Sequence, residues 1–229
     1  NENYRFQPWF RRMKELIEGG AIGDPFYARF HIHGRHSLPE FFFGEQTDLF
    51  SGMERLILFE VGVHYLDTMR YLLGEPRALF ASANKVSPHG KGEDSAVVLG
   101  QYTHASALVD SSWASLSDDT PPEPVSDQTY VVEGSAGTLH LDYNATLNLL
   151  TDTGRSSEQF GADGPQLGFG NAFEHFVQGV TTGAPFETGA EETRKTMELV
   201  FGAYQSAATG DAYHPGDALS MFNGKGERT

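Results

Sequence analysis

Three titratable side chains recur along a short and otherwise apolar stretch that runs from Phe59 to Pro76. Glu60, His64 and Asp67 stand at positions i, i+4 and i+7, which a helix places on one side. An imidazole with its ordinary pKa of about 6.5 is suited to exchanging a proton with a hydroxyl group near neutral pH. Glu60 could accept a hydrogen bond from that imidazole or bind a hydroxyl group, and Asp67 could orient the ring. The same pattern is also typical of a local surface pair, so its chemistry depends on its surroundings.

The pattern of this stretch predicts a helix, and the pattern of a segment further upstream predicts a strand. Leu66, Met69 and Leu73 form an apolar side that would pack on the rest of the domain, and Gly74-Glu75-Pro76 ends the element. Upstream, Phe26–His33 alternates between apolar and polar residues, which predicts a strand with one buried face. His36–Leu58 has no clean period. Segments of that length in compact domains are usually functional or mobile.

The remaining elements are expected from periodicity and from turn residues. We expect a helix that starts at Pro8 and ends at Gly19-Gly20. Short segments with strand character follow residue 77; they are Ala78–Val86, Ser95–Tyr102, Ala105–Leu116, Gln128–Glu133, Thr138–Asp142 and Thr146–Leu150. Their short links predict antiparallel pairing. Two closing helices are expected at Asn171–Thr182 and Glu191–Thr209. The sum is a single α+β domain over residues 1–229, with a largely antiparallel open sheet and helices packed on one face.

Composition narrows the possible partners. The 229 residues carry a formal net charge of −15, and such a surface repels phosphate backbones and anionic membranes. We therefore expect neither nucleic acid nor a membrane as a partner. The sequence has no Cys, which excludes disulfides and thiolate-ligated metal centres. Because the N-terminus lacks a basic-then-apolar signal pattern, we expect a cytoplasmic protein.

Three histidines invite a metal interpretation. His31 and His33 share one strand face and His36 follows closely, so with Glu60 or His64 they could form a zinc-type site. Histidines on an exposed sheet face are more often plain polar surface, and we expect no metal. His33 or Arg35 could instead line a substrate cleft.

Four segments resemble the C-terminal domain of the Gfo/Idh/MocA family, which includes glucose–fructose oxidoreductase and inositol dehydrogenase. In chain order they read YRFQPWFRRMKELIEGGAIGDP, EVGVHYLDTMRYLLGEP, VVEGSAGTLHLD and FEHFVQGVTTGAPFETGAEETRKTMELVFGAYQSAATG. The second is similar to the family's acid–x–Gly–x–His–x–x–Asp run. The resemblance covers nearly the whole chain, from Asn3 to Gly210.

The resemblance implies the substrate-binding and oligomerisation domain of a two-domain, NAD(P)-dependent dehydrogenase. Neither the Gly-rich strand–turn–helix of a Rossmann domain nor the family's Glu-Lys-Pro tripeptide occurs in this sequence. NAD or NADP would therefore be bound by a missing N-terminal domain, and this chain alone is expected to bind no cofactor and to be inactive. The substrate would be a sugar, a polyol or a related hydroxylated compound.

The resemblance also suggests roles for single residues. His64 matches the family's catalytic or substrate-binding histidine, and Glu60 stands where most members have Asp. Tyr4 and Arg5 match a segment that passes near the active cleft, so Arg5 could contact substrate or cofactor, or form a salt bridge at the surface or between domains. Many members carry Gly-Gly-Gly where this chain has Glu54-Arg55-Leu56, and the larger side chains should reshape the pocket.

Two further readings stay open, and one assembly is expected. The chain could be a naturally Rossmann-less dimerisation or ligand-binding module, or a cofactor-free lyase or isomerase that uses His64 and Glu60. Ser95–Tyr102 and Ala105–Leu116 carry apolar residues that would lie on the helix-free face of the sheet. Burial of that face against a second copy predicts a homo-oligomer.

Overall fold

The computed structural model describes residues 2–34, 47–115 and 128–216 of the chain. One mixed sheet of eight strands has the order β2-β3-β4-β1-β5-β6-β7-β8. The strands are β1 Pro25–His33, β2 Ala78–Asn84, β3 Ser95–Gln101, β4 Ser106–Ser112, β5 Gln128–Gly134, β6 Gly137–Leu141, β7 Thr146–Thr151 and β8 Gly154–Gln159. The expected strands are confirmed to within a few residues, and β8 is an addition. Its six residues are all exposed, so it lacks the apolar alternation that marks a strand in sequence.

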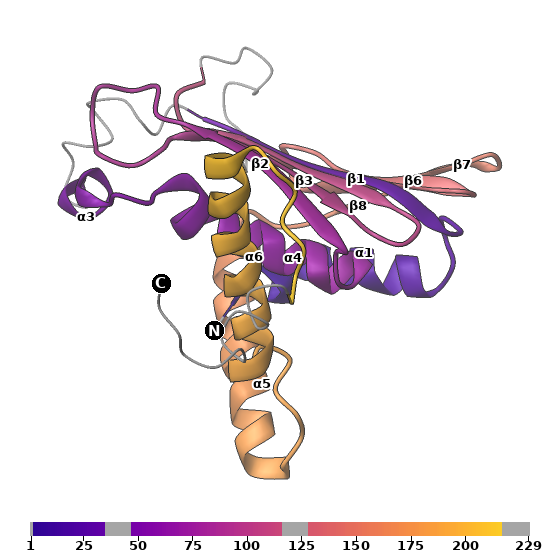
Figure 1. The fold of residues 1–229 in the computed structure, drawn as a ribbon. Coiled ribbons are helices and arrows are strands. Elements are labelled where there is room, and N and C mark those ends of the chain that lie inside the picture. The colour runs from indigo at the N-terminus through magenta and orange to yellow at the C-terminus, as the bar shows by residue number, and fades with distance from the viewer. Residues whose placement is uncertain (1, 35–46, 116–127, 217–229) are drawn as a thin grey trace.

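All helices of the described residues lie on one side of the sheet, and within this part of the chain the other side carries none (Figure 1). They are η1 Tyr4–Phe6, α1 Pro8–Glu18, α3 Thr47–Gly52, η2 Ile57–Val61, α4 Gly62–Leu73, α5 Gly164–Thr182 and α6 Ala190–Thr209. The predicted α+β architecture with a largely antiparallel open sheet is thus confirmed. Helix α5 begins seven residues before the expected start, because Pro165 is tolerated in a first turn.

One strand pairing is parallel. The short links give antiparallel pairs from β2 to β4 and from β5 to β8, as predicted. Strand β1 lies between these two groups, antiparallel to β5 and parallel to β4, with Tyr27 opposite Ser106. No local turn links β1 to either neighbour. The central position of the first strand therefore could not be read from turn residues.

An aromatic cluster fixes helix α4 to the sheet. The ring of Phe30 on β1 lies 4.7 Å from that of Tyr130 on β5, and the ring of Phe10 on α1 lies 4.8 Å from Tyr130. Tyr65 of α4 packs edge-on against Phe30 at 6.4 Å. All four side chains are almost fully buried. Because Tyr65 is anchored in this cluster, the neighbouring His64 is held at the rim of the core. Gly74, at φ 87°, then ends α4 in a backbone conformation that residues other than glycine rarely adopt.

Candidate active site

Glu60 and His64, the two candidate catalytic groups, lie at the junction of a single π-helical turn and helix α4. Ile57–Val61 forms a π-helical turn that continues directly into α4. Glu60 lies in this turn and His64 lies in the first turn of α4. Single π-helical turns within helical segments are frequent at functional sites, and here the turn and α4 form one continuous helical segment that carries both Glu60 and His64.

His64 is held by two residues from the start of the chain. Its Nδ1 lies 2.5 Å from Oε2 of Glu2, and the Glu2 side chain is 9% exposed. The ring of Tyr4 stacks on the imidazole with 4.2 Å between centroids and 5° between planes. A carboxylate on Nδ1 selects the tautomer that carries its proton there and leaves the lone pair on Nε2. Among the described residues no hydrogen-bond partner lies at Nε2, and the side chain is 24% exposed. The imidazole is therefore oriented with one nitrogen ready to accept a proton.

Glu60 lies beside this pair without the hydrogen bond expected from the sequence. Burial raises the pKa of the Glu60 carboxyl, the charge of His64 lowers it, and that of Glu2 raises it, with a net upward shift. The partner of His64 Nδ1 is Glu2 rather than Glu60. Of the two roles weighed for Glu60, a hydrogen bond from Nδ1 is thus wrong, because the Glu2 carboxylate occupies that position. The other role, binding of a hydroxyl group by Glu60, stays a prediction.

Asp67 and Arg5 bind each other instead of facing the imidazole or a ligand. Arg5 Nε and Nη2 each lie 2.7 Å from an oxygen of Asp67, and Thr196 Oγ1 donates to Asp67 Oδ1 at 2.8 Å. The side chains of Arg5 and Asp67 are 7% and 2% exposed. The expected contact of Asp67 with His64 is therefore wrong. Of the roles weighed for Arg5, the structure shows the salt bridge, which ties η1 to α4 and so holds Tyr4 and Glu2 against His64.

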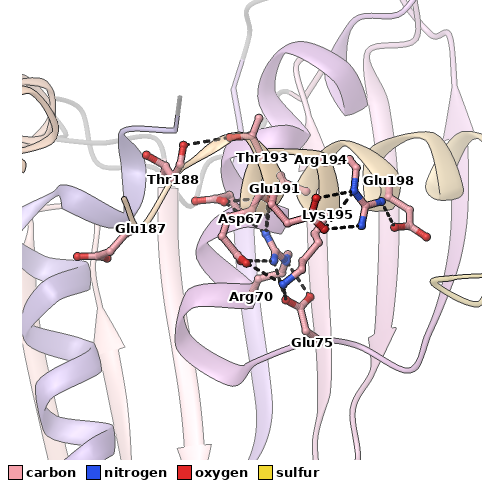
Figure 2. A network of polar contacts seen from close by, with 12 residues as sticks. Asp67, Arg70, Glu75, Glu187, Thr188, Glu191, Thr193, Arg194, Lys195 and Glu198 are labelled. Carbon is pink, nitrogen blue, oxygen red and sulfur yellow. Dashed lines mark hydrogen bonds and ion pairs between the residues drawn. The ribbon is translucent and has the colours of Figure 1, made fainter. Parts of the chain in front are cut away.

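The polar network extends from Asp67 along α6 (Figure 2). Arg70 is buried and donates to Thr196 Oγ1, to the Glu75 carboxylate and to Glu192. These bonds fix the angle at which α4 crosses α6, and with it the direction of the helix that carries His64.

A second carboxylate, Glu93, holds the π-turn from the other end. Its Oε1 accepts hydrogen bonds from the backbone N–H groups of Leu56 and Leu58, both at 3.1 Å, and from the Tyr204 hydroxyl. Ile57, which lies between Leu56 and Leu58, donates its N–H to the backbone carbonyl of Glu93. Glu93 thus supplies acceptors for three successive N–H groups at the start of the turn.

The loop before the π-turn carries the bulky residues noted in the sequence. The guanidinium of Arg55 lies over the rings of Phe201 and Tyr204 at 5.5 and 5.4 Å, while Leu56 is buried. Arg55 therefore packs against α6 and covers the side of the π-turn that faces it.

His33 does not share a side of the sheet with His64. In β1 the residues Ala28, Phe30 and Ile32 are buried on the helix side, so His31 and His33 point to the opposite face. There His31 Nδ1 and His33 Nε2 lie 3.3 and 3.0 Å from the two oxygens of Asp110 on β4. Two alternatives that the sequence left open therefore do not hold: His33 does not line a cleft on the side of His64, and His31 and His33 do not join Glu60 or His64 at a metal site. Arg35 and His36 lie outside the described residues.

In the trio of His31, His33 and Asp110, burial and the charge of the hydrogen-bond partner shift the pKa values in opposite directions. Burial alone would raise the pKa of Asp110, but hydrogen bonds and charge from His33 and His31 outweigh it and lower that pKa. Burial and the neighbouring charge of His33 lower the pKa of His31, against the influence of Asp110.

A cavity of about 840 Å³ lies away from His64, between the end of α4 and the β3–β4 turn. Its lining includes Leu73, Glu75, Tyr102 and His104. None of the groups brought together around His64 contributes to it. Glu60 and His64 line neither this cavity nor the smaller one beside His175 and Phe186.

The sequence pattern found His64, Glu60 and Tyr4 but missed the residues that position them. Glu2 and Glu93 are single acids distant in sequence from the helix, and nothing in their immediate surroundings marks them. The alternation along β4 places Asp110 on the face opposite the buried residues. The parallel β1–β4 pairing that brings Asp110 to His31 was not predicted.

A strand-rich α+β domain with an oriented histidine at the start of a helix is the architecture of a known family. Residues 10–140 match the model of the GFO/IDH/MocA C-terminal domain, and the chain belongs to this family. It is 32% identical over 225 residues to a D-apiose dehydrogenase of Rhizobium rhizogenes and 30% identical over 232 residues to one of Paraburkholderia graminis. These matches cover 92% of this chain in both cases.

Solved structures agree with this assignment. An oxidoreductase from Agrobacterium radiobacter, crystallised with NAD+, L-tartaric acid and magnesium, superposes with a TM-score of 0.84 at 28% identity, over 96% of this chain and 65% of that one. The chain spans 62% and 57% of the lengths of the two D-apiose dehydrogenases, so its relatives contain further sequence. Within the described residues, no helix is long and apolar enough to cross a membrane.

Proposed function

We propose that this chain is the substrate-binding and catalytic half of an NAD(P)-dependent dehydrogenase that acts on a sugar, a polyol or a related hydroxylated compound. The observation that carries the proposal is the arrangement around His64. Its Nδ1 is paired with Glu2, its ring is stacked on Tyr4, and its Nε2 has no hydrogen-bond partner among the described residues.

In this role His64 handles the proton of the substrate hydroxyl. Oxidation of a secondary alcohol to a ketone removes a hydride from carbon and a proton from oxygen, and the nicotinamide would take the hydride. His64 Nε2 takes the proton, and the imidazolium that forms is stabilised by the Glu2 carboxylate at Nδ1. The stacked ring of Tyr4 fixes the plane of the His64 imidazole, so that Nε2 approaches the hydroxyl from one direction.

Glu60 is proposed as the group that binds a neighbouring hydroxyl. Its raised pKa means that burial works against the charged form, and a ligand hydroxyl that donates to the carboxylate would offset this cost. Vicinal hydroxyl groups, one to His64 and one to Glu60, are the feature that sugars and polyols share.

The nicotinamide cofactor does not fit this chain alone. The sequence offers no strand followed by a Gly-rich turn and a helix to cradle a pyrophosphate. The cofactor would therefore be held by sequence outside this domain. The fraction of relatives' length that the chain leaves uncovered and the NAD+ of the Agrobacterium radiobacter complex support this part of the proposal.

The helix-free face of the sheet is proposed to bind a second copy. Phe80, Val97 and Leu99 are 47%, 41% and 44% exposed, and Phe80 and Leu99 are register partners on adjacent strands. Leu108 of β4 continues this row. A contiguous apolar row across three strands is costly to leave in water, and burial against its own copy would remove it.

The test compares His64→Ala with His104→Ala in the complete enzyme, with a panel of pentoses, polyols and sugar acids as substrates. His104 lies in an exposed turn away from the candidate site. We expect His64→Ala to lower kcat by about 10²–10⁴-fold and His104→Ala to leave it unchanged. Equal activity of both variants would refute the assigned role of His64. Turnover without any nicotinamide cofactor would instead support a lyase or an isomerase.

A further inference from the structure

We propose that His31, His33 and Asp110 form a binding site for one divalent transition-metal ion, with zinc as the representative ion, on the helix-free face of the sheet. This site is independent of the site around His64, which lies on the helix side.

The donor atoms have the types and the spacing that such an ion requires. One ring nitrogen of His31, one ring nitrogen of His33 and a carboxylate oxygen of Asp110 all lie within 4.8 Å of one another. Ligands on tetrahedral zinc, at bond lengths of about 2.0–2.1 Å, are separated by about 3.3 Å. The distances from His31 Nδ1 to Asp110 Oδ2 and from His33 Nε2 to Asp110 Oδ1 are 3.3 and 3.0 Å, so each imidazole already lies at about this spacing from an oxygen of the carboxylate, although from a different oxygen in each case. Two imidazoles and one carboxylate also match the donor preference of zinc and related ions.

The scaffold beneath these ligands is rigid. His31 and His33 alternate along β1, and their rings stack with centroids 4.0 Å apart. Asp110 is the register partner of His31 on the parallel strand β4. Both strands lie in the interior of the sheet, and each has a neighbour on both sides. Ligands that stand on central strands keep their relative positions without ordering a loop, which lowers the entropic cost of binding.

The environment leaves room for an ion and for a fourth ligand. The side chains of His31, His33 and Asp110 are 16%, 22% and 34% exposed. In a single chain the trio is thus accessible from one direction, where water would complete a tetrahedral shell, and in the proposed assembly a donor group of the second copy could take that place because Asp110 lies opposite Val97 of the apolar row. Arg29 lies on the same face two residues before His31 and opposes a cation by charge, so we expect micromolar rather than picomolar affinity.

The alternative to a metal site is a hydrogen-bonded cluster of the two imidazoles and the carboxylate. In that case Asp110 accepts from both rings through its two oxygens, and the cluster only satisfies polar groups on the sheet surface. The alternative predicts no saturable metal binding, so one titration separates the two.

The experiment uses the complete protein without a polyhistidine tag, stripped with chelator and desalted. Zinc is titrated at pH 7.5 by calorimetry, and cobalt(II) is titrated in parallel for the intense visible absorption of a tetrahedral site. We compare the parent protein with His33→Ala, Asp110→Asn and His140→Ala. His140 lies on β6 on the same face, across β5 from β1, and serves as the matched control.

We expect one equivalent of zinc per chain, a loss of affinity of about tenfold or more in His33→Ala and Asp110→Asn, and no change in His140→Ala. Melting curves recorded in chelator check that each variant is folded, and a variant that unfolds is replaced by His33→Gln. Absence of stoichiometric binding at about 100 μM zinc, or equal affinity of the parent and His33→Ala, overturns the proposal.

Discussion

Arg5 and Asp67 form a buried bidentate ion pair that joins the start of the chain to helix α4. Both contacts measure 2.7 Å, and Thr196 of α6 donates to the same carboxylate. Three segments distant in sequence thus meet at one carboxyl group. Because Glu2 and Tyr4 lie just before Arg5 in the sequence, the Arg5–Asp67 pair positions the groups that orient His64.

Asp67→Asn should destabilise the protein strongly. The substitution leaves the Arg5 guanidinium buried without its counter-charge, which costs about 3–5 kcal/mol in comparable sites. Urea unfolding measures the change. Arg194→Ala removes an exposed pair with Glu191 and should stay within about 0.5 kcal/mol. A loss below about 1 kcal/mol for Asp67→Asn would mean that the guanidinium finds another partner.

Glu2→Ala should lower turnover without a matching loss of substrate affinity. In the proposed mechanism Glu2 acts on the imidazole and not on the substrate, so kcat should fall about tenfold or more while KM changes little. Nitrogen-15 NMR of the imidazole supplies a readout that a purely structural role would not move. We expect the Nδ1–H tautomer to dominate in the parent enzyme and to lose that preference in Glu2→Ala. An unchanged tautomer would remove Glu2 from the mechanism.

Glu60→Gln should change stability in a pH-dependent manner. Burial raises the pKa of Glu60 in the folded state, so the folded protein favours the protonated carboxyl. The contribution of this group to stability is therefore present below its unfolded pKa, about 4.3, and is lost as the pH rises through the raised value. Relative to the parent, Glu60→Gln should gain melting temperature at pH 7.5 and lose that gain at pH 4.5. A constant difference across this range would contradict the raised pKa.

Glu93→Ala should loosen the π-turn. The substitution removes the acceptor of the Leu56 and Leu58 N–H groups and of the Tyr204 hydroxyl. Unpaired donors at such positions cost about 1–3 kcal/mol, measured as a shift in the urea midpoint. Glu54→Ala removes a nearby exposed acid and should be neutral. If both variants behave alike, the turn is held by packing rather than by Glu93.

Leu99→Glu should prevent the proposed self-association. The charge would lie in the middle of the apolar row on the helix-free face, where contact with a second copy desolvates it. Light scattering coupled to size exclusion measures the mass. Thr153→Glu, in the exposed β7–β8 turn, is the control. An unchanged mass in Leu99→Glu would place the interface on another surface.

Local patterns in the sequence predicted the elements well, and contacts between distant segments poorly. The alternation in Phe26–His33 and the short links after Arg77 identified seven of the eight strands. The apolar side of the Leu66, Met69 and Leu73 helix did pack on the body of the domain. Such features depend on neighbours in sequence, which periodicity records.

The polar partners could not be predicted for a physical reason. Asp67 is as close in sequence to His64 as to Arg70, and only the three-dimensional path of the chain brings Arg5 to it. Likewise, Glu2 reaches His64 across sixty-two positions. Sequence identified which groups could do chemistry, while the fold decided which of them face each other.

The parallel pairing of β1 with β4 also has a kinetic consequence. Strands β2 to β4 and β5 to β8 form two groups whose members follow one another along the chain, and such local pairings close quickly. Strand β1 is the only connection between the groups in the described sheet, and its pairing with either requires closure of a long loop. The first strand is made before both of its neighbours, so it must remain unpaired until they exist. Its insertion, which also brings His31 to Asp110, is expected to be the slow step in the folding of this domain.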